Sequence, residues 1–122
     1  MRDFKNLEVW RKSHQLTLAV YRAPEGFPRS ALFGLTNQIR RAASSIEANL
    51  AEGCGRTQAE FAKFVQIAAG SNCELECHLL LARDLSLLGV ERHQQLLCQV
   101  EAVRRMLNAL LKTIRGVEIS RV

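Results

Sequence analysis

Prolines, aromatic residues and long apolar runs are all scarce in this sequence. Its 122 residues include only two prolines and seven glycines, which excludes a collagen-like or proline-rich chain. No apolar run approaches the roughly 18 residues of a membrane span, and the first residues lack the apolar stretch of a signal peptide. We therefore expect a single soluble, cytoplasmic domain with no membrane partner.

Cysteines in the arrangement of a metal site are also missing. Cys73 and Cys77 precede His78, but zinc sites bring a second pair of ligands on a converging segment. The two remaining cysteines, Cys54 and Cys98, stand alone. The sequence predicts free thiols, no metal and no cofactor.

Catalytic motifs are absent as well. No H-E-x-x-H, phosphate-binding loop or G-x-S-x-G occurs. None of the histidines, His14, His78 and His93, lies four to six residues after an arginine, the spacing used by one family of helical-bundle ribonucleases. Glu74 precedes His78 by four residues rather than the three of di-iron bundles. We expect a protein that is not an enzyme.

Positive charge is what the sequence has in excess. Lysines and arginines number 17 against 12 acidic residues, a net charge of +5, and 13 of the 17 are arginines. Residues 1–50 carry eight basic and four acidic side chains, whereas the rest of the chain is nearly balanced. Because guanidinium groups suit phosphates, the excess is compatible with a nucleic-acid partner. A merely solvated basic surface is the alternative.

Apolar residues at spacings of three and four predict four helices, at about 7–23, 30–54, 57–88 and 90–114. Short connections make neighbouring helices antiparallel, so the expected fold is all-α, an up-down-up-down four-helix bundle. The third helix is the longest in this prediction. Its overhanging apolar face favours self-association, with a bent helix as the alternative.

Local signals mark where these helices begin and end. Asn6 is the expected cap of the first helix, and Thr57 with Glu60 forms a capping box that opens the third. Gly89 and Gly116 are the expected stops of the last two helices. The predicted apolar stripe of the first helix is Leu7, Trp10, His14, Leu18 and Tyr21, and that of the second is Leu32, Leu35, Ile39, Ala42, Ile46, Asn49 and Gly53.

Polar and small residues interrupt two of these stripes. An amide such as that of Asn49 needs partners when buried, and such residues often fix register or oligomeric state. Gly70 in mid-helix is expected at a close helix contact, with Glu74 one turn further on as a hydrogen-bond acceptor. The residues predicted to support architecture or assembly are Asn49, Glu52, Gly53, Gly70, Ser71 and Glu74.

Several runs of the sequence carry a family resemblance. They are LEVWRKS at 7–13, GLTNQIRRAASSI at 34–46, NLAEGCGR at 49–56 and IAAGSNCEL at 67–75, with Phe27-Pro28 and Glu60-Phe61 between them. On these residues the chain resembles the bacterial four-helix bundle family that includes proteins encoded in intervening sequences of large-subunit ribosomal RNA genes. The accessory variability determinant of diversity-generating retroelements is similar. Leu32, Asn72 and Cys73 depart from the family's usual residues.

The resemblance implies a four-helix bundle that closes into a cyclic homo-oligomer, a pentamer in members of known architecture. Relatives from retroelements bind nucleic acid and a reverse transcriptase through a basic surface. The partners implied are therefore other copies of this chain, RNA or DNA, and a protein.

Arginine clusters supply the candidate contacts with phosphate. They are Arg11, Lys12, Arg22, Arg29, Arg40, Arg41, Arg104 and Arg105. Arg41 has an alternative role, since it lies beside the seam of its helix and can pair internally with Glu52 or Glu74. The alternative function is a protein-interaction scaffold with no direct nucleic-acid role.

Overall fold

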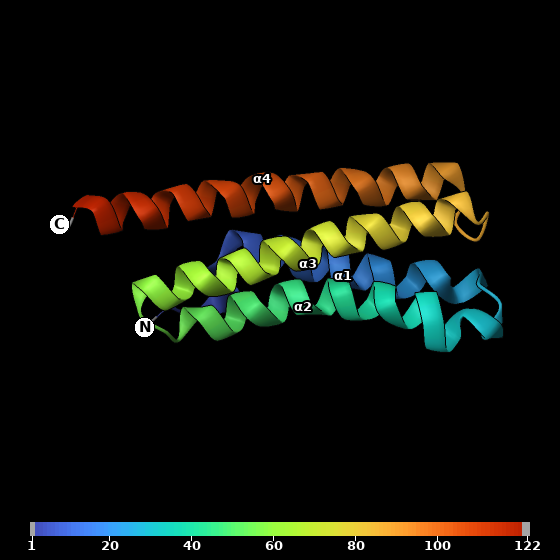
Figure 1. Cartoon of the computed structure of the whole chain (residues 1–122), viewed down its shortest axis with the longest axis horizontal. Coiled ribbons are helices and arrows are strands. Elements are labelled where there is room, and N and C mark those ends of the chain that lie inside the picture. Colours follow the sequence, from blue (N-terminus) through green and yellow to red (C-terminus); the bar gives the residue numbers. More distant parts are fainter. Residues whose placement is uncertain (1, 121–122) are drawn as a thin grey trace.

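The computed structural model describes the backbone of residues 2–120 and the side chains of these residues other than 32 and 117–120. Within them it contains no strand and four α-helices, which are α1 (Glu8–Arg22), α2 (Asn37–Cys54), α3 (Gln58–Asp84) and α4 (Val90–Ser120). Consecutive helices run in opposite directions (Figure 1). α2 packs along α3, α3 packs along α4, and α1 contacts both α2 and α4. The predicted all-α, four-helix architecture is confirmed.

An apolar core runs along the axis of the bundle. Its largest fully buried side chains include Leu16 of α1, Ile46 and Leu50 of α2, and Phe61 and Leu75 of α3. From α4 the core takes apolar residues at spacings of three, four and seven, and each of these is at most 1% exposed: Leu96, Val100, Val103, Leu107 and Ile114. Burial of this apolar surface is the main force that holds the four helices together.

The predicted apolar stripe of α1 is wrong. The side chains that α1 buries are Val9, Ser13, Leu16, Thr17 and Val20, whereas Leu18 and Tyr21 are each 44% exposed. The hydroxyls make this burial possible, because Ser13 donates to the Val9 carbonyl (2.7 Å) and Thr17 donates to the Ala43 carbonyl of α2 (3.1 Å).

The first helix also begins differently from the prediction. A short 3-10 helix, Phe4–Asn6, precedes α1, and its cap is Asp3, whose carboxylate accepts from the Lys5 amide at 3.0 Å. Leu7 occupies the N-cap position of α1 without a side-chain hydrogen bond, so Asn6 is not the cap. The threonine half of the predicted box before α3 is confirmed, because Thr57 Oγ1 accepts from the Glu60 amide at 3.3 Å.

The second predicted helix starts too early. Residues Arg29–Ala31 form a 3-10 turn, Leu32–Thr36 form a π-helical turn, and the regular α2 begins only at Asn37. Gly34, with φ −108° and ψ −108°, leaves the helical conformation at this point. Periodicity alone continues through such a kink, because glycine lets the backbone depart from the helix without disturbing the apolar spacing. The predicted packing of the Leu32 side chain lies outside the described residues.

The third helix ends earlier than predicted and the fourth ends later. α3 stops at Asp84. In the turn that follows, Ser86 adopts φ +60°, and the backbone amides of Leu87 and Leu88 donate to the Ala82 carbonyl. α4 continues past Gly116, so this glycine does not end it. The longest helix is therefore α4, which projects beyond the start of α3 at the carboxyl end (Figure 1). The prediction that the third helix is the longest is wrong.

Candidate nucleic-acid interface

Three of the candidate phosphate contacts meet where the chain passes from α1 into α2. Arg22 is the last residue of α1. Arg40 of α2 donates from Nη2 to the backbone oxygen of Tyr21, the residue just before Arg22, at 2.8 Å. The Arg40 guanidinium lies 5.3 Å from the centre of the Tyr21 ring. Arg29 and Arg40 line one hollow of about 200 Å³ at this turn. We call Arg22, Arg29 and Arg40 the basic end.

Sequence reasoning missed Arg92, which joins the basic end from α4. Its Nη2 donates to the Ala19 carbonyl of α1 (3.4 Å), and it lines a second hollow together with Arg22. The predicted helix order was enough to place Arg92 at this end of the bundle. In an up-down-up-down bundle the start of the fourth helix lies beside the end of the first, so a basic residue there belongs to the same end.

Arg11 and Lys12 lie elsewhere on α1. Arg11 donates to the Lys5 carbonyl (3.0 Å), and Lys12 lines a hollow shared with α4. Both side chains are exposed. Ten residues separate Lys12 from Arg22, which corresponds to about 15 Å along a helix, so the structure does not place this pair in the basic end.

The two candidate contacts on α4, Arg104 and Arg105, differ from each other. Arg104 forms an ion pair with Glu76 of α3, whereas Arg105 is exposed. Arg104 is therefore the one candidate contact whose charge is neutralised by a carboxylate of the described residues.

The expected internal pairing of Arg41 does not occur among the described residues. Glu52 pairs with Arg56 (2.5 Å), and the Glu74 carboxylate lies 3.3 Å from His78 Nε2. Arg41 is exposed and lines a hollow of about 360 Å³ between α2 and α3, with Glu74 on the opposite side.

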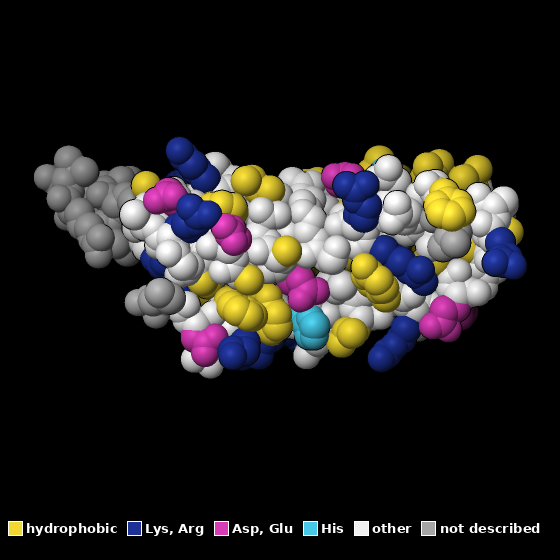
Figure 2. Space-filling model, turned by 90° about the horizontal axis from the view of Figure 1, so that it is seen from below, with side chains coloured by type: hydrophobic (Ala, Val, Ile, Leu, Met, Phe, Trp, Pro, Cys, Tyr) yellow, Lys and Arg dark blue, Asp and Glu magenta, His cyan; other side chains and the backbone are white. Residues whose placement is uncertain are grey.

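Basic and acidic side chains are interspersed over the surface. Figure 2 shows Lys and Arg side chains at both ends of the face seen from below, with acidic and apolar side chains between them. Several of the basic side chains gather over the right half of that view, where α1 passes into α2 (Figure 2). The structure therefore offers a local basic end and separate basic residues rather than one continuous basic surface.

Two of the predicted architectural residues, Asn49 and Ser71, take part in a chain of hydrogen bonds between α2 and α3. Asn49 Nδ2 donates to the backbone oxygen of Ser45 (2.8 Å) and to its hydroxyl (3.0 Å). The Ser45 hydroxyl in turn lies 2.9 Å from that of Ser71. Asn49 is half-buried and finds its partners on its own helix, so the link to α3 runs through Ser45.

The two predicted architectural glycines have different surroundings. A Cβ atom at Gly53 would lie 2.8 Å from Phe64 Cβ and 2.9 Å from Phe61 Cδ1, so only glycine lets the ends of α2 and α3 approach this closely. A Cβ at Gly70 would meet nothing within 4 Å. The prediction that Gly70 lies at a close helix contact is wrong for the described residues of this chain.

Cysteines and metal-ligating groups form no cluster in the part of the chain that the structure describes. Cys54 is buried, and this burial raises the pKa of its thiol. The other three cysteines are exposed free thiols. No group of three histidine, cysteine or acidic side chains there is arranged to hold a metal ion. None of the described helices is both long and apolar enough to span a membrane.

The fold and the surface define an all-α helical-bundle protein whose charged features are arginine clusters. The model of the 23S rRNA-intervening sequence protein family matches residues 5–109. This chain belongs to that family, which confirms the family resemblance predicted from the sequence.

A solved structure shows the same fold. It is a protein of unknown function from the S23 ribosomal protein family of Bacteroides thetaiotaomicron, 22% identical to this chain. The similarity covers 85% of this chain and 95% of the other, with a TM-score of 0.79. A comparison with curated protein sequences finds no match.

Proposed function

We propose that this protein is a non-enzymatic, homo-oligomeric helical bundle that binds RNA or DNA through its unpaired arginine and lysine side chains. One observation carries the proposal. Of the eight candidate contacts, only Arg104 forms an ion pair with a carboxylate of the described residues. The other seven keep a full positive charge available for phosphate oxygens.

The expected mode of binding is contact with the phosphate backbone. Several cationic groups contributed by α1, α2 and α4 near one end of the bundle match a polyanion better than a single charged group does. Stacking on aromatic side chains is a secondary contribution, because Trp10 is engaged with Phe4 and with His14, whereas Phe33 is 91% exposed in the turn before α2. Binding of this kind has weak sequence preference and strong dependence on salt.

Self-association is part of the proposal. α3 exposes Leu80 and Leu81 by 41% and 47%, and the turn that follows it exposes Leu85 by 57%. Neighbouring exposed leucines of this kind favour contact with a second protein surface. The family resemblance supports a ring of copies, with a pentamer as the expected size, and a ring multiplies the number of basic ends available to one nucleic acid.

The same leucines favour the alternative function, a scaffold that docks a different protein. The charge reversal Arg11→Glu with Lys12→Glu separates the two functions. A phosphate-binding protein loses affinity for nucleic acid, whereas a protein that docks its partner through leucines keeps that interaction.

Fluorescence anisotropy with a labelled structured RNA and a labelled DNA duplex tests the basic end. The double variant Arg22→Ala/Arg29→Ala removes two unpaired cations, and the matched control Arg56→Ala/Arg83→Ala removes two that are paired with Glu52 and Asp84. We expect the first variant to bind several-fold more weakly, with a salt slope smaller by about two, and the control to stay near wild type. Equal losses in the two variants would contradict the assignment.

A further inference from the structure

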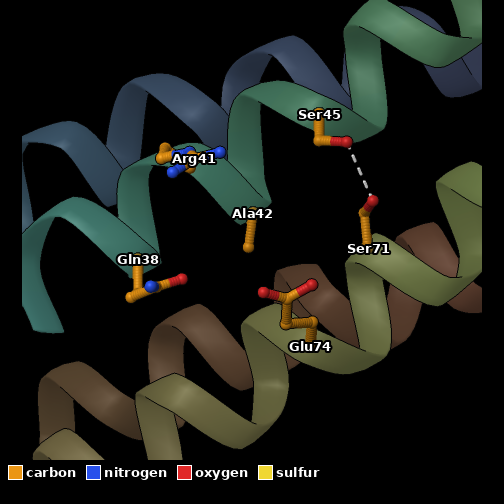
Figure 3. Close-up of a pocket in the computed structure, with 6 residues that line it drawn as sticks. All are labelled: Gln38, Arg41, Ala42, Ser45, Ser71 and Glu74. Carbon is orange, nitrogen blue, oxygen red and sulfur yellow. Dashed lines mark hydrogen bonds between the residues drawn. The ribbon is translucent and has the colours of Figure 1, made fainter.

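The hollow between α2 and α3 is lined by charged and polar groups, of which Arg41 alone is among the candidate phosphate contacts. Its six lining residues are Gln38, Arg41, Ala42, Ser45, Ser71 and Glu74. In Figure 3 the Glu74 carboxylate and the Gln38 amide turn toward the space between the two helices. The hollow exists because the residues between them, Ala42, Ser45 and Ser71, are small. Its volume of about 360 Å³ lies at the lower end of the range of small-molecule sites, roughly 300–1,000 Å³.

The two charged groups of the hollow do not neutralise each other. Arg41 forms no ion pair within the described part of the chain, and the ion pair of Glu74 is with His78, on its own helix. The hollow therefore offers a cationic donor on α2 and an anionic acceptor on α3. Gln38 adds one amide donor and one acceptor.

Hydrogen bonding at the base of the hollow adds a further donor. The Ser45 hydroxyl accepts from Asn49 Nδ2 at 3.0 Å and lies 2.9 Å from the Ser71 hydroxyl. When Ser45 donates to Ser71, the Ser71 hydroxyl keeps its own hydrogen, which an acceptor of a ligand in the hollow can take. A matching ligand then presents adjacent donors toward Glu74 and adjacent acceptors toward Arg41 and Ser71.

We propose that this hollow binds an unpaired guanine base of RNA. Guanine has two neighbouring donors, N1–H and the N2 amino group, that match a carboxylate, and beside them the acceptors O6 and N7, which are the usual targets of arginine. Adenine and cytosine each have an acceptor on the edge where guanine has N1–H. Bases in single-stranded loops are read on these edges and stack on guanidinium planes, so a site without an aromatic ring suffices.

The position of the hollow connects it to the basic end. Arg41, which lines the hollow, directly follows Arg40, which lines the turn between α1 and α2. An RNA backbone held by the basic end therefore passes close to the hollow. A carboxylate repels phosphate, so phosphate binding gives Glu74 no role beside Arg41, whereas base recognition does. This inference rests on the proposed function.

Two RNA hairpins that differ at one loop nucleotide test the inference, one with guanosine and one with inosine, which lacks the N2 amino group. Fluorescence anisotropy gives Kd for both. We expect wild type to bind the guanosine hairpin roughly tenfold more tightly. Glu74→Gln should bring the ratio of the two Kd values close to one, and the loss of one negative charge should leave affinity for the inosine hairpin equal or higher.

A matched variant controls for charge. Glu91→Gln removes a carboxylate that is exposed at the start of α4 and forms no ion pair within the described residues. It should change both Kd values by the same factor and keep their ratio. Circular dichroism verifies that each variant keeps its helical content.

The contradicting results are distinct. Salt-dependent binding with equal Kd values in wild type would overturn the guanine site and leave the proposed function standing. A wild-type preference that persists in folded Glu74→Gln would overturn the role of Glu74. If neither hairpin bound even at low salt, the proposed function itself would fail.

Discussion

Identical residue types have opposite roles at different positions of this bundle. Gly53 lies where α2 and α3 converge, with phenylalanine atoms less than 3 Å from the place that a Cβ would occupy. Gly70 lies on the exposed surface of α3 with open space around it. The first glycine is required by packing, whereas the second costs helix stability without any contact in the described residues to explain it.

The substitution Gly53→Ala is expected to lower the free energy of unfolding by about 1–3 kcal/mol, because Phe61 and Phe64 must move to accommodate the methyl group. Gly70→Ala is the matched control, since the same change at an open helical site raises the free energy of unfolding by about 1 kcal/mol. Chemical denaturation followed by circular dichroism measures both. Two changes of the same sign would contradict this difference in packing.

Buried polar residues are the reason why the sequence alone did not predict every buried helix face. The apolar spacing of α4 predicted most of its buried face, but it missed the buried side chain of His93, which is 5% exposed. On α1 the buried face includes Ser13 and Thr17, whose hydroxyls find backbone carbonyls only once the helix and its neighbour have formed. Asn72 is another example, 1% exposed and donating to the Val100 carbonyl of α4 at 3.0 Å. Hydropathy does not reveal such partners.

At the scale of the elements, helix number and order follow from the sequence, whereas some helix ends do not. The turn Leu32–Thr36 keeps its apolar residues in helical spacing although Gly34 breaks the regular backbone. α3 ends at Asp84, and the positive φ of the turn that follows falls at Ser86, four residues before the start of α4 at Val90, and not at the nearby Gly89. Chain reversal there depends on the hydrogen bonds to the Ala82 carbonyl, which no local signal predicts.

Ser86 gives a prediction about this turn. A non-glycine residue at φ +60° pays a steric cost of about 1 kcal/mol that glycine avoids, so Ser86→Gly should raise the free energy of unfolding by up to about that amount. Ser86→Ala, which loses the hydroxyl but keeps Cβ, is the control and should bring no gain. Thermal unfolding compares the three proteins. A larger gain for alanine than for glycine would show that the backbone conformation is not the cause.

At the scale of the whole molecule, folding changes the distribution of charge that the sequence suggested. The excess of basic residues lies in the first 50 residues, but the bundle brings Arg92 of α4 beside Arg22 of α1. It also separates Arg11 and Lys12 from that end, and it pairs Arg104 with Glu76. The candidate residues could be chosen by type from the sequence, whereas their grouping depended on helix direction and on cross-helix pairs.

The exposed leucines Leu80, Leu81 and Leu85 provide a test of the proposed self-association. Leu81→Lys places a charge among Leu80, Leu81 and Leu85, and it should shift the protein toward a single protomer of 13.7 kDa. Gln66→Lys introduces the same charge at an exposed polar position of the same helix and should leave the assembly unchanged. Light scattering coupled to size-exclusion chromatography measures the mass. An unchanged mass in Leu81→Lys would contradict self-association through these leucines.

The most direct test of the central claim is the affinity of the wild-type protein for a structured RNA, measured across salt concentrations. If unpaired arginines and lysines bind phosphates, the logarithm of the association constant falls linearly with the logarithm of salt concentration, with a slope set by the number of phosphates contacted. A steep linear fall is the predicted result. Absence of binding at low salt, or an affinity that salt does not change, would contradict nucleic-acid binding through these side chains.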